Sequence, residues 1–154
     1  MVADVGAGRV MAVATNWLCW ALLSAVFAAL TAIFAKIGLR SVDSDLATLI
    51  RTGVIMVVLS LFVYLTGKWS NPAELSRKTW LFLGLSGLAT GASWVCYFRA
   101  LQLGDASKVA PVDKLSVLFV AVIAVLLLGE RPSGREWVGI LMVGAGVLIM
   151  ALKV

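Results

Sequence analysis

Five ionisable side chains lie within or beside long apolar runs of this sequence, where a charge is costly enough to be informative. They are Lys36, Arg51, Arg99, Asp113 and Lys114. A charge inside a bilayer costs several kcal/mol, so such residues usually face the interior of a helix bundle and mark a binding site or an ion path. Four cations accompany the single carboxylate of Asp113. The set therefore predicts a site with surplus positive charge that binds an anionic or carboxylate-bearing ligand.

The partners of these charges can be predicted from helix geometry. Adjacent residues of a helix point about 100° apart, so Asp113 and Lys114 are expected to be poor partners for each other. We therefore expect Asp113 to pair with Arg51, Arg99 or Lys36 from another helix. The alternative is structural. Lys36 and Arg99 lie near helix ends, where long cationic side chains reach the headgroups, and Arg51 with Asp113 would be an ion pair that fixes helix packing.

Aromatic residues and a proline surround these charges. Trp94, Tyr97 and Phe98 come just before Arg99 and are expected to wall a cavity. Pro111 lacks a backbone donor and restricts the residue before it, which predicts a broken or kinked helix start. Interrupted helices of this kind often flank the site in transporters. The predicted substrate-binding residues are Arg51, Lys114, Asp113, Arg99, Lys36, Trp94 and Tyr97.

Positioning these residues requires elements that cross a membrane. Apolar residues make up 62% of the 154-residue chain and charged residues 14%, whereas soluble domains are about half apolar and a quarter charged. A soluble fold of this size would leave much of that apolar surface in water. We predict an all-α integral membrane protein, a bundle of five transmembrane helices in a single domain over 17–152, preceded by a flank over 1–16. The helices cover about 17–39, 46–65, 80–103, 106–128 and 135–152.

Two of these helices must include charge if they are to span the bilayer. The clean apolar run Val54–Leu65 has twelve residues and Leu115–Leu128 has fourteen, whereas a span needs about 20. The helices therefore extend back through Arg51 and through Lys114 and Asp113. Otherwise both helices are half-spanning or re-entrant, and these charges lie at an interface.

Several functions are excluded by what the sequence lacks. The chain has no histidine, and its two cysteines, Cys19 and Cys96, are distant and lie in apolar runs, so we expect no metal site and no cofactor. The basic residues, with a net charge of +5, form no stripe of the kind that binds nucleic acid. Without a metal cluster or a nucleophile–base pair, no enzyme active site can be assembled.

Small residues suggest where helices meet. Gly87 and Gly91 form a GxxxG pair on the third helix, and Gly139 and Gly144 lie on the fifth. Small residues let helix backbones approach closely in lipid. We predict that these glycines pack helices together, either within one bundle or, for one of them, at a dimer interface.

The orientation of the bundle is weakly specified. Five spans place the termini on opposite sides, and the side of the N-terminus holds six basic residues: Arg9, Lys68, Arg77, Lys78, Arg131 and Arg135. The other side holds seven: Lys36, Arg40, Arg51, Arg99, Lys108, Lys114 and Lys153. Leaving out the four helix residues among these mildly favours a cytoplasmic N-terminus. This near balance predicts insertion in both orientations and antiparallel pairing, with a fixed orientation as the alternative.

Three stretches of the sequence resemble one known family. They are ALTAIFAKIGL at Ala29–Leu39, YFRALQLGDASKVAP at Tyr97–Pro111, and LGE at Leu128–Glu130 before a Gly-rich last helix. Together they look like a repeat of the EamA family, in the drug/metabolite transporter superfamily, and the likeness covers residues 17–152. Members commonly carry two such repeats of opposite orientation around a central path. The resemblance therefore implies a half-size member of the bacterial inner membrane that acts as an antiparallel homodimer.

The resemblance and the charges together predict a transporter subunit that moves a small polar or anionic metabolite by alternating access. Related small multidrug resistance proteins use a glutamate in the first helix, whereas 17–39 holds no acidic residue, so drug-cation/proton exchange of that type is not implied. Two alternatives remain open. One is a flippase-like protein for a lipid carrier, and the other is a membrane scaffold or accessory subunit that transports nothing.

Overall fold

The computed structural model describes the backbone of residues 3–151 and side chains from Trp17 to Ala151, and the regular secondary structure of this part is entirely helical. Five helical segments are long and apolar enough to cross a membrane, which confirms the predicted fold class. They are Trp17–Gly38, Ser44–Leu65, Arg77–Leu103, Ala106–Leu128 and Gly134–Ala151. The first belongs to α1, Ala3–Gly38, so residues 3–16 of the expected flank continue the first helix. The expected helix end at Leu152 lies outside the described residues.

Side-chain caps explain where several helices begin. The carboxylate of Asp43 accepts hydrogen bonds from the backbone N–H groups of Asp45 and Leu46, so α2, Ser44–Leu65, begins earlier than expected. Ser76 caps α3, Arg77–Leu103, in the same way. Before α6, Gly134–Ala151, Ser133 and Glu136 bond to each other's backbone N–H groups, which is a capping box. A short 3₁₀ turn, Pro72–Glu74, interrupts the connection between α2 and α3.

The fourth span is divided into three segments. α4, Ala106–Asp113, is followed by a turn, then α5, Ser116–Ile123, and a π-helical stretch over Ala124–Leu128. Around the turn the backbone bonds run from residue i to residue i−3, as in Lys114 N to Pro111 O at 2.9 Å. The fourth span is interrupted, but not at its start as Pro111 predicted: Pro111 lies inside α4, and the break falls between Asp113 and Ser116. Gly129 ends the span with a positive φ of 69°, which favours glycine.

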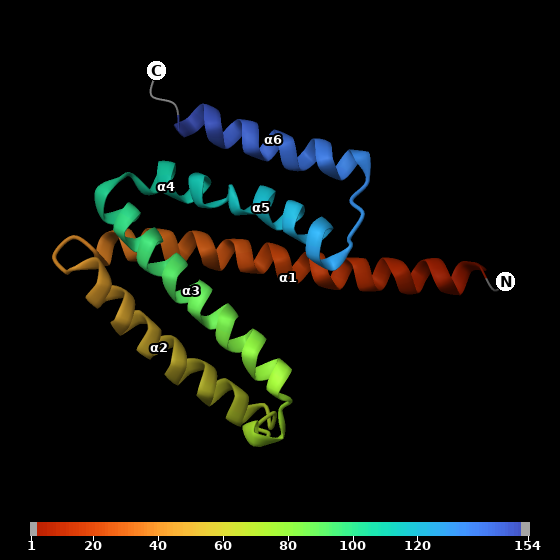
Figure 1. Cartoon of the computed structure of the whole chain (residues 1–154), viewed down its shortest axis with the longest axis horizontal. Coiled ribbons are helices and arrows are strands. Elements are labelled where there is room, and N and C mark those ends of the chain that lie inside the picture. The colour runs from red at the N-terminus through yellow and green to blue at the C-terminus, as the bar shows by residue number, and fades with distance from the viewer. Residues whose placement is uncertain (1–2, 152–154) are drawn as a thin grey trace.

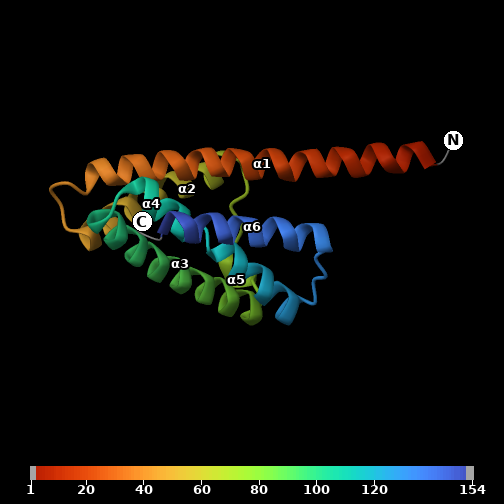
Figure 2. The ribbon, with the colours of Figure 1, turned by 90° about the horizontal axis from the view of Figure 1, so that it is seen from above.

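The helices converge at one membrane face and separate toward the other. α2 packs on α3, α4 and α5 pack on α6, and α1 contacts both α3 and α4. Figure 1 shows the α2–α3 pair inclined away from the layer of α1, α4, α5 and α6, and Figure 2 shows α1 along one side of the bundle. We call the face of convergence the Lys36 end, since α1 ends there close to the start of α2, the end of α3 and the start of α4.

The small hydrophobic core lies at the Lys36 end. Leu39, Phe98 and Leu101 form a buried cluster, and Leu101 has no exposed surface. Most large apolar side chains elsewhere are exposed, including Leu59, Phe82 and Ile149. Such an exposed apolar surface is unsuited to water and suits lipid hydrocarbon.

Candidate functional site

Arg51 is held against the faces of two aromatic rings. Its guanidinium carbon lies 4.4 Å from the ring centroid of Trp94 and 4.7 Å from that of Phe98, both on α3. Cations are attracted to ring faces at this distance, more so when water is excluded. The Nη1 atom of Arg51 is buried, and no hydrogen-bond partner is found for it among the described residues. A buried donor without a partner is unfavourable, so this nitrogen needs an acceptor that the described residues do not supply.

A cavity of about 880 Å³ lies beside Arg51. We call it the Arg51 cavity. The small residues of α1, including Ala21, Ser24 and Ala25, form one wall, whereas Trp94 and Tyr97 of α3 form another. The third wall is the helix break, with Pro111, Asp113 and Lys114. Five of the seven predicted site residues therefore surround one cavity: Arg51, Trp94, Tyr97, Asp113 and Lys114.

The cavity lies within the membrane. Arg51 is seven residues from the start of α2 and Lys114 is eight from the start of α4. At 1.5 Å per residue both lie about 10–12 Å below the Lys36 end, well inside a hydrocarbon core of about 30 Å. Both candidate spans include the charged residues as predicted, but α2 runs unbroken through Arg51 whereas the fourth span carries Asp113 and Lys114 at a helix break.

The expected partner of Asp113 was wrong. Its carboxylate lies 3.1 Å from the ammonium of Lys114, its neighbour in sequence. In a regular helix the two side chains would point apart, but the helix ends at Asp113, and Lys114 lies in the turn that follows. There the long lysine side chain can fold back onto the preceding carboxylate. The pair contributes one charge of each sign to the cavity wall, so it does not neutralise Arg51.

Lys36 does not line the Arg51 cavity. Its ammonium donates to the backbone carbonyl oxygens of Leu101, at 2.6 Å, and Gly104, at 2.8 Å. The last carbonyls of a helix lack partners within the helix and carry partial negative charge, so they favour a cation. Lys36 thus fastens the end of α1 to the end of α3.

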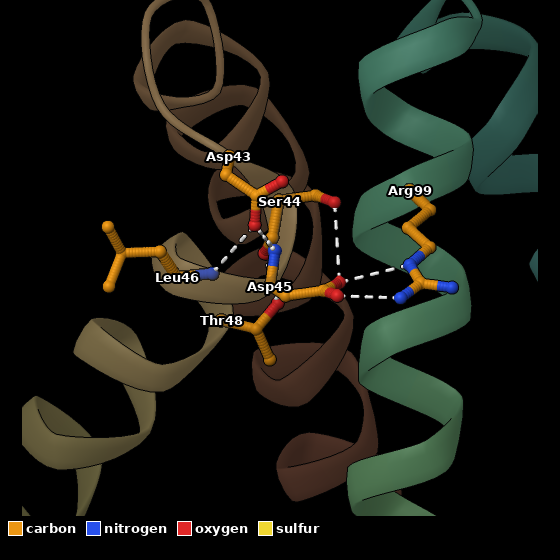
Figure 3. Close-up of polar contacts among 6 residues, drawn as sticks. All are labelled: Asp43, Ser44, Asp45, Leu46, Thr48 and Arg99. Atoms are coloured by element: carbon orange, nitrogen blue, oxygen red, sulfur yellow. Dashed lines mark hydrogen bonds and ion pairs between the residues drawn. The ribbon is translucent and has the colours of Figure 1, made fainter.

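Arg99 is paired with Asp45, which lies just before the second helix as predicted over 46–65. Its Nε and Nη2 atoms donate to the two oxygens of Asp45, at 3.0 Å and 2.6 Å (Figure 3). Asp45 lies in the first turn of α2, which Asp43 caps (Figure 3). The signal that could have revealed this pair is the position of Asp45 directly before an apolar run, at the same membrane face as Arg99. The pairing of Arg99 with Asp113 was therefore wrong as well.

The four glycines predicted to pack helices have different surroundings. A side chain at Gly144 would place its Cβ 2.8 Å from Cδ2 of Leu118, so α6 approaches α5 closely there. Gly87, Gly91 and Gly139 have no such neighbour within 4 Å in this chain. The cysteines Cys19 and Cys96 are both exposed and free.

A bundle of apolar spans enclosing a cavity with an unneutralised cation is typical of a membrane transporter. The comparison with known families agrees with this class: residues 15–152 match the EamA-like transporter family. The chain belongs to that family. It is thus a multi-pass integral membrane protein of the bacterial inner membrane, as its sequence predicted.

Curated relatives carry transporter names. The chain is 57% identical over 137 residues to an uncharacterized transporter in the cobO 3′ region of Sinorhizobium sp, covering 89% of this chain and 97% of that one. It is 25% identical over 137 residues to the uncharacterized transporter YxxF of Bacillus subtilis, covering 88% of this chain but only 42% of YxxF. These names point away from an enzyme.

A third relative is a flippase subunit. The chain is 29% identical over 86 residues to the probable 4-amino-4-deoxy-L-arabinose-phosphoundecaprenol flippase subunit ArnE of Pseudomonas fluorescens. That match covers 55% of this chain and 73% of ArnE. No solved structure matches the chain.

Proposed function

We propose that this transporter moves a small polar or anionic metabolite through the Arg51 cavity by alternating access, acting as an antiparallel homodimer. The observation that carries the proposal is Arg51 itself, which lines an intramembrane cavity and whose buried Nη1 atom has no hydrogen-bond partner among the described residues. Arginine presents several donors in one plane, which suits a carboxylate or a phosphate.

The charge balance of the site supports an anionic ligand. Lys36 donates to backbone carbonyls, Arg99 is paired with Asp45, and Lys114 is paired with Asp113. Among the described residues that line the cavity, Arg51 is thus left with a charge that no carboxylate balances. A ligand anion would supply the missing charge and the missing hydrogen-bond acceptor. Asp113 would position Lys114 or carry a coupling proton.

Alternating access requires that the cavity is closed toward one membrane face and can later open toward that face. Polar contacts between helices gather at the Lys36 end: Lys36 with the end of α3, Arg99 with Asp45, and Gln102 with the carbonyl of Val42 at 3.2 Å. Toward the opposite face the α2–α3 pair separates from the other helices (Figure 1). We propose that the Lys36 end is the closed gate in this structure, and that the interrupted fourth span permits it to open.

The homodimer is supported by length and by charge. The chain matches 42% of the length of YxxF, as expected if a second copy supplies what the longer relative carries in one chain. The near balance of basic residues on the two sides supports antiparallel pairing.

A second candidate function is a flippase-like role for a lipid carrier. It is favoured by the likeness to a flippase subunit, and an anionic headgroup would fit Arg51 equally well. As a flippase subunit, like the relative, this chain would assemble with a different chain and not with a second copy of itself. A scaffold without transport is the remaining alternative, and nothing specific favours it.

Uptake by purified protein in liposomes tests the proposal. We would compare wild type with Arg51→Gln, Arg51→Lys and Asp113→Ala, using radiolabelled succinate, citrate and inorganic phosphate as probes. Lys78→Gln removes a charge near the opposite face and is the control. We expect the wild-type protein to take up at least one of these probes. Uptake of that probe should be about tenfold slower in Arg51→Gln, because a hydrogen bond to a charged group contributes about 1.5–3 kcal/mol. Uptake that is equal in wild type and all variants would refute the charged site.

The dimer needs its own test. Cysteines introduced at both termini of a Cys19→Ser, Cys96→Ser variant would be labelled in cells with a membrane-impermeant maleimide. Labelling of both termini from outside supports dual orientation, whereas labelling of one terminus alone rejects it. A monomeric mass for the protein in lipid nanodiscs would reject the homodimer.

A further inference from the structure

A second cavity, separate from the Arg51 cavity, lies between α3, α4 and α6. Its volume is about 630 Å³. The walls are mainly apolar and include Ala100, Val109, Val112 and Met150. The side chains of Val112 and Met150 are exposed on the outer surface of the bundle. A cavity with such walls inside a bilayer is open to lipid chains.

The depth of this cavity corresponds to one leaflet of the bilayer. Lys108 lies two residues from the start of α4, about 3 Å from the Lys36 end, and Met150 is at the end of α6 on the same face. At the other extreme, Ser93 lies ten residues before the end of α3, or about 15 Å deep. This is half of a hydrocarbon core of about 30 Å.

A cation stands at the mouth of the cavity, at the level of the lipid headgroups. The ammonium of Lys108 lies 3.7 Å from the carboxylate of Asp105, beyond hydrogen-bonding distance, and both side chains are mostly exposed. Such a pair contributes little, so Lys108 is free to bind a phosphate. The other charged residue of the lining, Asp113, is paired with Lys114, so Lys108 supplies the positive charge that attracts an anionic headgroup.

From these features we propose that the cavity between α3, α4 and α6 binds an anionic phospholipid of the leaflet at the Lys36 end. The headgroup phosphate binds Lys108, and one acyl chain lies against Ala100, Val109, Val112 and Met150. Ser93, Tyr97 and Asp113 line both this cavity and the Arg51 cavity. A bound lipid therefore supports the wall of the transport site, although the lipid site does not depend on what is transported.

Protection of a cysteine tests this site directly. Cys96 lines the cavity, whereas Cys19 lies near the opposite membrane face. In detergent micelles, N-ethylmaleimide labelling of Cys96 in a Cys19→Ser variant would be timed with added phosphatidylglycerol, phosphatidylcholine or inorganic phosphate. Cys19 in a Cys96→Ser variant is the control. We expect phosphatidylglycerol to slow the labelling of Cys96 several-fold more than phosphatidylcholine does, and to leave Cys19 unaffected.

The role of Lys108 is tested in the same assay. Lys108→Gln, an exposed change that leaves the core untouched, should raise the phosphatidylglycerol concentration needed for protection about fivefold, the usual effect of one cation near an anionic lipid. Lys78→Gln should change nothing. Equal protection by the two lipids, or no effect of Lys108→Gln, would overturn the proposal. Protection by inorganic phosphate alone would also overturn it, since the site would then bind a free anion and no lipid chain.

Discussion

The ammonium of Lys36, at the end of α1, lies 2.6 Å from the carbonyl oxygen of Leu101, at the end of α3. The two residues are 65 positions apart in sequence, so this contact joins the first and third spans. Leu101 is fully buried, and its neighbour in the core, Phe98, lies against the guanidinium of Arg51. The contact therefore links the closure of the Lys36 end to the residue that we propose binds the ligand.

Lys36→Met should loosen this end of the bundle. The substitution keeps much of the side-chain volume but removes both hydrogen bonds, and hydrogen bonds to a charged group contribute about 1.5–3 kcal/mol. We expect a lower melting temperature in detergent and faster labelling of a cysteine placed at Ser93 by reagent added from the Lys36 end. Lys78→Met, near the opposite face, is the matched control. If the labelling rate at 93 is unchanged while the melting temperature falls, Lys36 stabilises the bundle but does not control access to the cavity.

The pair of Arg99 and Asp45 should matter less for stability than Lys36 does. Both side chains are about half exposed, and exposed ion pairs contribute little. Asp45→Asn and Arg99→Gln should each lower the melting temperature slightly, and the double variant should lose no more than the larger single loss, because the same contact is removed. Additive losses in thermal unfolding would show that the two residues act independently.

The sequence predicted the spans well but the contacts poorly, for a physical reason. Hydrophobic length defines which residues cross the bilayer, so the inclusion of Arg51 and Lys114 could be deduced by counting. Which side chains meet depends on the rotation and tilt of each helix, which hydropathy does not encode. Lys36 donates to backbone carbonyls, which any residue can provide, so no pattern of side chains in the sequence predicts that contact.

Local breaks in the helices caused the other errors. Asp113 and Lys114 would be poor partners in an unbroken helix, but the helix ends between them. Pro111 was expected to disturb the helix start, but the break falls after it, between Asp113 and Ser116. The role of Asp45 depends on the cap provided by Asp43, which lengthens α2 toward Arg99.

Trp94→Leu should weaken ligand binding by releasing Arg51. The indole ring supports the guanidinium at 4.4 Å, and a cation–π contact contributes about 0.5–2 kcal/mol. For a probe whose uptake requires Arg51, we expect KM to rise several-fold with a smaller change in the maximal rate. Trp94→Phe keeps a ring face and should retain most of the affinity. Equal KM values in Trp94→Leu and Trp94→Phe would contradict a supporting role for the ring.

Gly144→Ala should destabilise the bundle, whereas Gly139→Ala, on the same helix, should not. The new Cβ at 144 would lie 2.8 Å from Cδ2 of Leu118, so the end of that side chain must move. Because only the flexible end of a side chain is displaced, we expect a loss at the low end of the about 1–3 kcal/mol that overpacking costs. At 139 nothing of this chain lies within 4 Å. Thermal unfolding in detergent and in nanodiscs would measure both. If Gly139→Ala lowers stability only in nanodiscs in which the protein is dimeric, then Gly139 packs against the second copy. In that case Gly144 packs helices within one chain, and Gly139 packs helices of two chains.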